Sequence, residues 1–589
     1  MDNNRPRRRP PARNIDGFVV PENKKVDGLK PRPLHKPEPI SPISKMADSG
    51  SMLNTTIPGK IYPSTPVDMH LNSKTKPPKQ KKKRSKKKII GLTALAIIIL
   101  ALVGGGWDAW QLYHKLHKLN VGNLTASVGG AENILVAGST NRCNLKVQNS
   151  QWGFCSDGVT GVNSDIIFIV HLVPSTHTAS LLSIPRDTFV PNARSGDEAF
   201  KIDAALYQGP TQLVTAVEQD FGIPIQHYAE VGFDGFVNIV NAVGGIKMNF
   251  PMPVYDSESY LNVQQPGCHE LNGVEALQVV RARHLQYKPA TVTTSSVHYW
   301  PQEAESDIAR IARTHEFLKV LASTVAGKGV SNPLTDQKLI DAVAPQIQVD
   351  NGLSTSTMIN LLQTFHAVDV NNVPEYTLPI VTPGFGNYDY QGAGMGDVVF
   401  PIEQTDEQII DKFLGTGSTA NTMSGKPLPE AQSVAVNVIN GSGVSEQAEG
   451  ISDELQKLGF NISSQPTSTT PVSSQAQETV VYYANKVTEA DALAVANKLT
   501  GYVILSQNSN KVTAGSEVTV ITGTDAAVSS PNASASSSTT TSPTTTANSA
   551  SSSSTSPLGP VSASNAALAA WDPIACSVNQ KVVPNNSNL

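Results

Sequence analysis

The sequence predicts an α/β protein whose larger folded part, residues 129–415, is a three-layer α/β/α domain with a central mixed sheet. Three near-continuous apolar runs, at 132–138, 165–173 and 179–185, are typical of strands that are buried on both faces. Strands of this kind alternate with helical segments, a pattern that favours helices packed on both faces of one sheet. A second, smaller globular region spans 432–523.

The helical segments of the larger domain lie at 210–222, 234–245 and 303–325. The first two end at Gly222 and at Gly244–Gly245, and glycine is a common residue at helix C-termini. The segment 303–325 carries the motif DIARIAR, in which two arginines lie one helical turn apart.

The N-terminal 88 residues differ from the rest in composition. They contain 22 Lys+Arg and 7 Asp+Glu, whereas the whole chain has a net charge of −4. Such a Pro-rich, basic segment buries too little apolar area to offset its chain entropy, so we expect 1–88 to be a disordered cytoplasmic tail. A uniformly basic nucleic-acid-binding protein is excluded by this uneven distribution.

A transmembrane helix is predicted over 89–110. The basic run of Lys79–Lys88 leads directly into 18 uncharged residues, 89–106, and aromatic residues follow at 107, 110 and 113. The positive-inside rule then predicts a single-pass protein of the cell membrane, with the N-terminus in the cytoplasm and everything after Tyr113 extracytoplasmic. A buried core helix or a cleaved signal peptide is the alternative. A core helix would rarely follow such a basic run, and an 88-residue leader is too long for an ordinary signal peptide.

The remaining segments are expected to be linkers, at 111–128 and 416–431, and a Ser/Thr-rich low-complexity tail at 524–589. Cys143 and Cys155 lie twelve residues apart and can form a disulfide outside the reducing cytosol, although two free thiols are the alternative. The pairing of Cys268 and Cys576 does not follow from the sequence.

Arginines mark the predicted functional site. Arg186 ends a buried strand in SIPRD, and Arg142 follows the first strand. Arg281 and Arg283 alternate in QVVRARH, which we interpret as a strand that points both side chains to one face. Guanidinium groups that converge repel each other unless an anion joins them, and phosphate or pyrophosphate matches their geometry. The full set is Arg142, Arg186, Arg281, Arg283, Arg310 and Arg313.

Three carboxylates accompany these arginines, namely Asp165, Asp187 and Asp307. Mg²⁺, or Mn²⁺ in its place, prefers one or two carboxylates plus phosphate oxygens, so a divalent metal is expected here. Each pair also has a structural interpretation, because Arg186–Asp187 and Arg310–Asp307 can be simple ion pairs and Arg313 an exposed charge. The sequence has no GxSxG elbow, no HExxH and no GxxxxGK[ST] loop, which disfavours hydrolases, zinc enzymes and nucleotide-binding proteins of those types.

These motifs resemble the LytR-CpsA-Psr family in content, order and spacing across 132–325. They are NILVAGSTNR, NSDIIFIVHL, LLSIPRDTFV, KIDAAL, FGIPIQHY, VGFDGFVNIVNAVGGI, LNGVEALQVVRARH and DIARIARTHEFL. Residues 434–523 resemble the small LytR C-terminal domain, which we interpret as a βαββαβ module. The resemblance implies a polyprenyl-pyrophosphate carrier held beside the sheet.

The resemblance also implies residue roles. Arg186, Arg281, Arg283 and Arg310 would bind the pyrophosphate, with Arg142 and Arg313 assisting, and Asp165 would carry Mg²⁺. Two positions depart from the usual pattern, since Thr140 replaces an Asp that helps to hold the metal and Thr314 replaces a Gln. We therefore expect altered metal dependence.

The expected function is a Mg²⁺-dependent phosphotransferase that moves a glycopolymer of teichoic acid, capsule or arabinogalactan type from its lipid carrier to peptidoglycan. Arg186 would stabilise developing charge, and Asp187 or Asp307 would take the proton of the attacking hydroxyl. One alternative is a polyprenyl-pyrophosphate pyrophosphatase. A regulator or transcription attenuator is another, but the Pro-rich tail lacks a recognition helix, so no specific nucleic-acid partner is expected.

Overall fold

The computed structural model describes residues 117–529 and 568–583, except for 128–129, 144, 146–150, 159, 197, 305, 328–342, 355–356, 359, 362–363, 365–367, 383–386, 391–392, 416–427 and 464–475. The predicted tail 1–88 and the predicted transmembrane helix 89–110 lie outside these residues. Within them, no helix is both long and apolar enough to cross a membrane.

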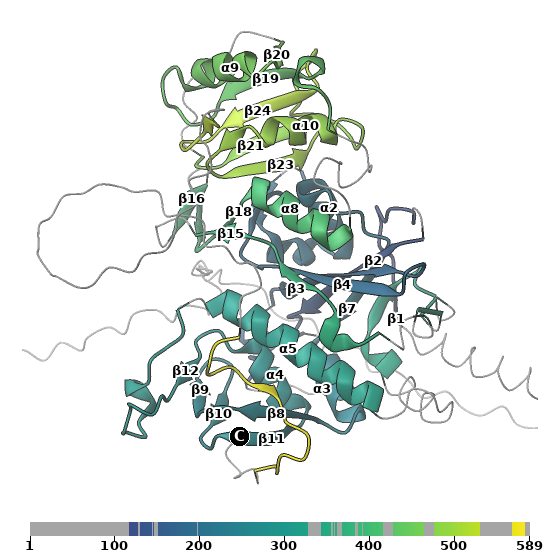
Figure 1. Cartoon of the computed structure of the whole chain (residues 1–589), viewed down its shortest axis with the longest axis vertical. Coiled ribbons are helices and arrows are strands. Elements are labelled where there is room, and N and C mark those ends of the chain that lie inside the picture. Colours follow the sequence, from purple (N-terminus) through teal and green to yellow (C-terminus); the bar gives the residue numbers. More distant parts are fainter. Residues whose placement is uncertain are drawn as a thin grey trace, which may run out of the picture. The chain divides into compact units, whose positions relative to one another are not determined.

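A seven-stranded mixed sheet forms the centre of the larger domain (Figure 1). Its middle strands β2, β3 and β4 are antiparallel, while β7 joins β2 and β14 joins β4 in parallel. The edge strand β1 lies inside the predicted linker 111–128, so that segment takes part in the fold. In sheet order the strands are β1 His117–Leu119, β13 Gln348–Asp350, β7 His227–Val231, β2 Glu132–Ser139, β3 Ser164–Val173, β4 Thr178–Ile184 and β14 Glu375–Thr377.

Helices lie on both sides of this sheet, as the alternating pattern predicts (Figure 1). On one side, α2 and α8 bury apolar side chains against Leu135, Ile169 and Leu182 of the strands. On the other side, α3, α4 and α5 share a core with β8 and β11. The elements are α2 Pro210–Phe221, α8 Glu403–Leu414, α3 Phe233–Ala242, α4 Gly273–Arg281, α5 Ser306–Gly327, β8 Ile246–Phe250 and β11 Gly267–Leu271.

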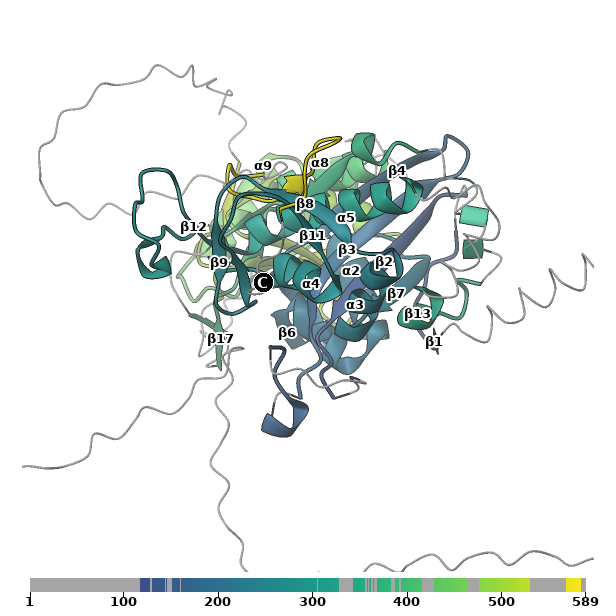
Figure 2. The ribbon, with the colours of Figure 1, turned by 90° about the horizontal axis from the view of Figure 1, so that it is seen from below.

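The remaining short elements form hairpins and turns around this frame. Figure 2 gives a second view of the molecule, from below. These elements are β5 Phe189–Arg194, β6 Glu198–Lys201, η2 Ile202–Gln208, β9 Val254–Asp256, β10 Leu261–Val263, β12 Gln286–Tyr287, β15 Ile380–Val381, β16 Tyr388–Tyr390, β17 Ala393–Gly396 and β18 Phe400–Pro401.

The motif QVVRARH is not a strand, contrary to the prediction from its alternation. Its first four residues are the last turn of α4, and the chain becomes extended at Ala282. A capping box starts this helix, in which the Asn272 side chain accepts backbone N–H groups while Glu275 accepts the N–H of Asn272. The cap fixes the helix register and therefore fixes where Arg281 leaves it.

The smaller domain is an α/β module with its own mixed five-stranded sheet in the order β20-β19-β24-β21-β23. The predicted βαββαβ order lacks one strand of this sheet. The additional strand, β23, lies between α10 and β24 and follows a turn at Gly501, where φ is +97°. The elements are β19 Ala435–Asn440, α9 Gln447–Lys457, β20 Asn461–Ile462, β21 Thr479–Tyr483, α10 Glu489–Ala496, β22 Leu499–Thr500, β23 Val503–Gln507, β24 Val518–Thr522 and β25 Ala527–Val528.

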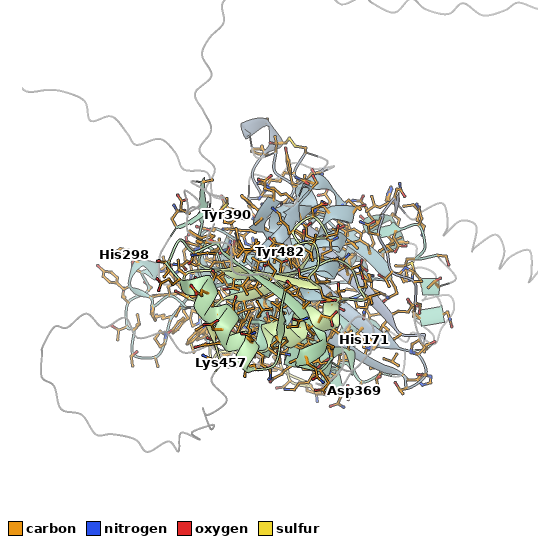
Figure 3. All side chains as sticks on the ribbon, turned by 90° about the horizontal axis from the view of Figure 1, so that it is seen from above. His171, His298, Asp369, Tyr390, Lys457 and Tyr482 are labelled. Atoms are coloured by element: carbon orange, nitrogen blue, oxygen red, sulfur yellow. A yellow bond between two sulfur atoms is a disulfide. The ribbon has the colours of Figure 1, made fainter. Side chains whose placement is uncertain are left out.

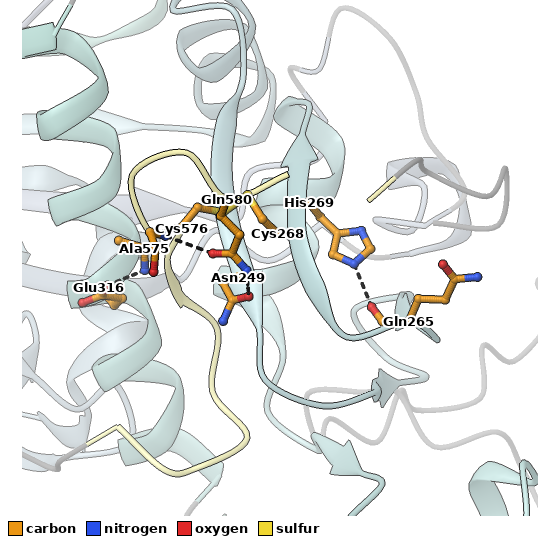
Figure 4. The surroundings of a disulfide bond; sticks show 9 residues. Asn249, Gln265, Cys268, His269, Glu316, Ala575, Cys576 and Gln580 are labelled. Carbon is orange, nitrogen blue, oxygen red and sulfur yellow. Dashed lines mark hydrogen bonds between the residues drawn. A yellow bond between two sulfur atoms is a disulfide. The ribbon is translucent and has the colours of Figure 1, made fainter. Parts of the chain in front are cut away.

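The last described segment, 568–583, belongs to the larger domain, although the sequence places it in the predicted tail. Its short strand β26 Ile574–Ala575 pairs with β8, beside which Figure 2 shows the yellow segment. The disulfide Cys268–Cys576 joins this segment to β11 (Figure 4). The disulfide expected between Cys143 and Cys155 is also formed.

Gly273→Ala tests the close packing of α4 on α3. A Cβ at Gly273 would lie well inside van der Waals distance of the backbone carbonyl oxygen of Val237. We expect the variant to lose roughly 1–3 kcal/mol of unfolding free energy, because backbone atoms must move apart. Differential scanning calorimetry measures this loss as a lower melting temperature.

Gly450→Ala is the matched control for that variant. Gly450 lies within α9 and a Cβ there would meet nothing within 4 Å. Since alanine is the better helix former, this control should be about 0.5–1 kcal/mol more stable. A Gly273→Ala protein that melts like the parent would contradict the steric account.

Candidate functional site

Arg186, at the end of β4, lies among carboxylates that come from neighbouring strands. Its Nη1 forms an ion pair with Oδ1 of Asp165, at the start of β3, and its Nε lies 3.4 Å from Oδ2 of Asp187. The antiparallel pairing of β3 with β4 brings the two strand ends together. The Arg186 side chain is only 12% exposed, so its guanidinium is held almost entirely by protein groups.

Asp187 and Asp307 connect Arg186 to the other predicted arginines. Asp187 accepts from Lys201 Nζ at 3.0 Å and lies 3.4 Å from Arg283 Nη2. Asp307, in the first turn of α5, lies 3.5 Å from Arg283 Nε and 3.0 Å from Arg310 Nη2. The strand ends, the segment after α4 and the start of α5 therefore meet in one network of alternating charge. We call it the arginine cluster; its members are Asp165, Arg186, Asp187, Lys201, Asp203, Arg281, Arg283, Asp307 and Arg310.

Arg281 and Arg142 lie over the ring of Phe233, the first residue of α3. Their guanidinium carbons lie 5.1 Å and 5.6 Å from the ring centroid, within cation–π range. Nε of Arg142 also donates to the carbonyl of Trp152 at 2.5 Å, inside the loop that the Cys143–Cys155 disulfide closes. Arg281 interacts electrostatically with Asp165, which connects this pair to the arginine cluster.

Arg313 lies behind the cluster and not within it, contrary to the prediction that it assists pyrophosphate binding. Its side chain is fully buried and forms a two-point ion pair with Glu303, at 2.6 and 2.8 Å. Asp572, from the far end of the chain, accepts from the same guanidinium at 2.9 Å. Residues three apart on a helix differ by about 60° in direction, enough to send Arg310 and Arg313 to different partners.

Two of the predicted carboxylates are strongly stabilised as anions. Burial alone would raise the pKa of Asp165, but the charges of Arg186, Arg310 and Arg283 outweigh burial and lower it to about 2. Burial likewise opposes ionisation of Asp187, whose pKa is nevertheless lowered by Arg186, Lys201 and Arg283. Both groups therefore carry negative charge at any physiological pH.

Asp203 behaves in the opposite way and was missed in the sequence. It lies in η2, two residues after Lys201 of β6, and its pKa rises to about 7. Burial is the main cause, opposed by Arg186, while the charges of Asp187 and Asp165 add to the rise. The run KIDAAL was visible, but nothing in one sequence shows that this aspartate is buried beside two ionised ones.

The cluster has more cationic than ionised acidic groups near neutral pH, which suits an anion. Burial lowers the pKa of Arg310 and of Arg281, and each also has a neighbouring arginine that lowers its pKa, Arg186 and Arg142 respectively. Among the residues that the structure describes, the buried Nε groups of Arg283 and Arg310 make no hydrogen bond. An anion with several oxygens would relieve this repulsion and accept from these donors.

A divalent metal fits this arrangement only with help from the substrate. No group of three or more His, Cys, Asp or Glu side chains that could hold a metal occurs in the part of the chain that the structure describes. Asp165 is ionised and one of its oxygens pairs with Arg186. Since Mg²⁺ takes one or two protein carboxylates and fills its shell with phosphate oxygens, Asp165 could carry it. Thr140 is buried, and its Oγ1 accepts the backbone N–H of Asn163 at 2.9 Å.

The histidines of this region do not join the cluster. Nε2 of His315 lies 2.7 Å from the Ser183 hydroxyl in the layer between α5 and the sheet, and burial lowers its pKa to about 4. His298 is exposed on an outlying loop (Figure 3). Thr314 donates to the carbonyl of Arg310, within its own helix.

Comparison with known proteins identifies the family of the chain. Residues 108–399 match the LytR_cpsA_psr family, and residues 433–525 match the family described as LytR cell envelope-related transcriptional attenuator. The chain belongs to the LytR-CpsA-Psr family, and it carries a LytR C-terminal domain.

Three curated relatives illustrate the similarity. Cell wall biosynthesis protein LcpA of Corynebacterium glutamicum is 26% identical over 466 residues, which is 70% of this chain and 82% of LcpA. Probable cell wall biosynthesis protein LcpB of the same species is 31% identical over 52% of this chain and 67% of LcpB. The polyisoprenyl-teichoic acid--peptidoglycan teichoic acid transferase TagV of Bacillus subtilis is 32% identical over 33% of this chain and 51% of TagV.

Asp203→Asn tests the raised pKa of this carboxyl group. Because folding raises the pKa, neutral Asp203 contributes stability that is full below about pH 4 and is lost as the pH rises through about 7. The asparagine stays neutral, so the variant should match the parent at low pH and exceed it increasingly up to about pH 7, with a constant difference above. Melting temperatures across this pH range measure the difference. A difference that is independent of pH would contradict the assignment.

Proposed function

We propose that this chain is a membrane-anchored phosphotransferase that moves a cell-wall glycopolymer from a polyprenyl-pyrophosphate carrier to peptidoglycan. The observation that carries the proposal is the arginine cluster, in which Arg186, Arg281, Arg283 and Arg310 gather from distant chain segments and the Nε groups of Arg283 and Arg310 make no hydrogen bond. Pyrophosphate has the charge and the oxygens that such a set of guanidinium groups can bind.

An apolar sheet face next to the cluster supports a lipid carrier. Along β2 and β3, the side chains opposite the α2–α8 face are apolar yet half-buried, among them Val136, Phe168 and Val170. The register places Val136 beside Phe168, on the strand that begins near Asp165. Half-buried apolar surface that runs toward a phosphate site suits a prenyl chain attached to that phosphate.

The relatives' names support the same chemistry. TagV is named for transfer of teichoic acid from a polyisoprenyl carrier to peptidoglycan, and LcpA for cell wall biosynthesis. The two disulfides support an extracytoplasmic position for the described domains, because disulfides persist in oxidising compartments. The predicted anchor at 89–110 would hold the domains at the membrane, where the carrier lies.

In the proposed reaction, a peptidoglycan hydroxyl attacks the phosphorus nearest the glycan. A new P–O bond forms to the acceptor, the P–O bond to the bridging oxygen breaks, and polyprenyl phosphate leaves. Arg186, Arg283 and Arg310 would neutralise the charge that moves onto the bridging oxygen.

The carboxyl groups divide the remaining roles. Asp187 is a poor proton acceptor because three cations hold its pKa down. Asp203, with a pKa of about 7, has a proton affinity suited to general base catalysis near neutral pH, and we propose it beside Asp307 as a group that can take the hydroxyl proton. Mg²⁺, when bound by Asp165 and the pyrophosphate oxygens, would supply further neutralisation of phosphate charge.

Arg186→Ala should abolish transfer while the protein stays folded. Removing this guanidinium takes away a principal cation of the site and leaves Asp165 and Asp187 with fewer compensating charges. We expect transfer to fall by about a thousandfold or more, measured as polyprenyl phosphate release from a glycan-linked polyprenyl pyrophosphate with peptidoglycan fragments present.

Arg194→Ala is the matched control for this variant, since Arg194 pairs with Glu198 on the β5–β6 hairpin, away from the cluster contacts. It should retain parental transfer. Near-normal transfer by Arg186→Ala would refute the proposed site. Release that is equal without peptidoglycan fragments would instead favour a pyrophosphatase that uses water as acceptor.

Thr140→Asp should increase the apparent affinity for Mg²⁺. Thr140 is the residue directly after β2, and a carboxylate at this position would add a second hard metal ligand near Asp165. The half-saturating Mg²⁺ concentration for transfer should fall by roughly tenfold, while Thr140→Ser should leave it unchanged. An unaltered Mg²⁺ profile in Thr140→Asp would contradict the metal role of this position.

A further inference from the structure

The segment 568–583 attaches to the larger domain beside α5. We call it the C-terminal strap. It pairs with β8 through Ile574 and Ala575, and the Cys268–Cys576 disulfide fixes it to β11. The side chain of Gln580 donates to Asn249 at 2.6 Å, and the backbone N–H of Ala575 donates to Glu316 of α5 at 2.9 Å (Figure 4).

The strap also forms a buried ion pair, between Asp572 and Arg313. Asp572 is 1% exposed and accepts from Nη1 of Arg313, which is 0% exposed, at 2.9 Å. The other Asp572 oxygen accepts the backbone N–H of Ala569 at 2.8 Å, which fixes the carboxylate within the strap. A buried guanidinium that loses an acceptor is left with an unsatisfied donor, which is costly, so this contact constrains both chain segments.

Arg313 in turn is attached to the walls of the arginine cluster. Its Nη2 donates to the backbone carbonyl of Ala282 at 2.6 Å, and Ala282 is the residue between Arg281 and Arg283. It also lies one turn after Arg310 on α5. The Trp571 ring of the strap stacks on Tyr287, four residues after Arg283, with centroids 3.8 Å apart and planes 6° apart.

We propose that the C-terminal strap is a positioning element for the arginine cluster, in which Asp572 acts through Arg313 to hold Arg283 and Arg310 in their binding geometry. The strap contacts α5, which supplies Arg310, and it contacts β12, which follows Arg283 in the chain. No part of the strap touches the cluster itself in the contacts that the described residues make, so its effect is indirect. The inference rests on the proposed pyrophosphate site.

The test measures binding of inorganic pyrophosphate to the full chain by titration calorimetry, well below the melting temperature. Asp572→Ala should weaken binding about tenfold, and Asp572→Asn, which keeps an acceptor for Arg313, should weaken it by less. Val578→Ala is the control within the strap, since Val578 is 91% exposed, and it should bind like the parent. Arg310→Ala serves as the reference for loss of the site.

The reference variant separates the two ideas. If Arg310→Ala binds weakly while Asp572→Ala binds like the parent, the strap has a purely structural role and the inference is overturned. If Arg310→Ala also binds like the parent, the pyrophosphate site is refuted, and the role of the strap in it falls too.

A second experiment avoids dependence on the folding of Asp572 variants. A protease site is inserted between residues 541 and 556, and the chain is cut after folding. The cut parent retains the strap through its disulfide and should keep its affinity for pyrophosphate. The cut Cys576→Ser chain should lose affinity once the freed peptide is removed.

Adding back a synthetic peptide of residues 568–583 with serine at 576 should restore binding, and the same peptide with Asp572→Ala should not. Full affinity of the cut Cys576→Ser chain without any peptide would overturn the inference. Equal rescue by both peptides would overturn the role of Asp572.

Discussion

The site depends on bringing several guanidinium groups out of water and close together. Such groups repel each other, and burial adds a desolvation cost that lowers the pKa of Arg281 and Arg310. The structure offsets this repulsion by alternating each arginine with a carboxylate, so that Asp187 lies between Arg186 and Arg283, and Asp307 between Arg283 and Arg310. The alternation is incomplete, and the remaining positive charge is available to a multivalent anion. Two features of the fold place the carboxylates where the arginines converge. The antiparallel pairing of β3 with β4 brings Asp165 close to Arg186 and Asp187, and Asp307 lies in the first turn of α5.

The same charges divide the aspartates into two classes without any difference in residue type. Asp165 and Asp187 each face cations at close range and remain anionic. Asp203 is almost fully buried, and this burial, together with the charges of Asp187 and Asp165, raises its pKa to about 7 against the opposing charge of Arg186. Groups whose environments push their pKa values apart are suited to different roles in acid–base chemistry.

Sequence patterns predicted the local structure well where a single segment determines it. The apolar runs at 132–138, 165–173 and 179–185 are β2, β3 and β4, and the glycine-terminated segments are α2 and α3. Alternation in QVVRARH was misleading, because the capping box at Asn272 makes its first half a helix, yet Arg281 and Arg283 still reach the same cluster. What a single sequence does not contain is contact between distant segments. One ion-pair partner of Arg313, Asp572, lies 259 residues away in the chain. The raised pKa of Asp203 likewise depends on charged neighbours from three strands and loops.

The Cys268–Cys576 disulfide joins residues 308 positions apart and changes how the small domain is attached. Everything between these cysteines, including β19 to β25, lies within one covalent loop. A domain appended to a C-terminus normally has one connection, whereas this one is connected to the larger domain on both sides. Breaking either connection leaves the module tethered by the other, so its effective concentration at the larger domain stays high. The strap at the end of this loop packs Trp571 on Tyr287 and pairs Asp572 with Arg313, so the same cross-link retains the module and these two contacts.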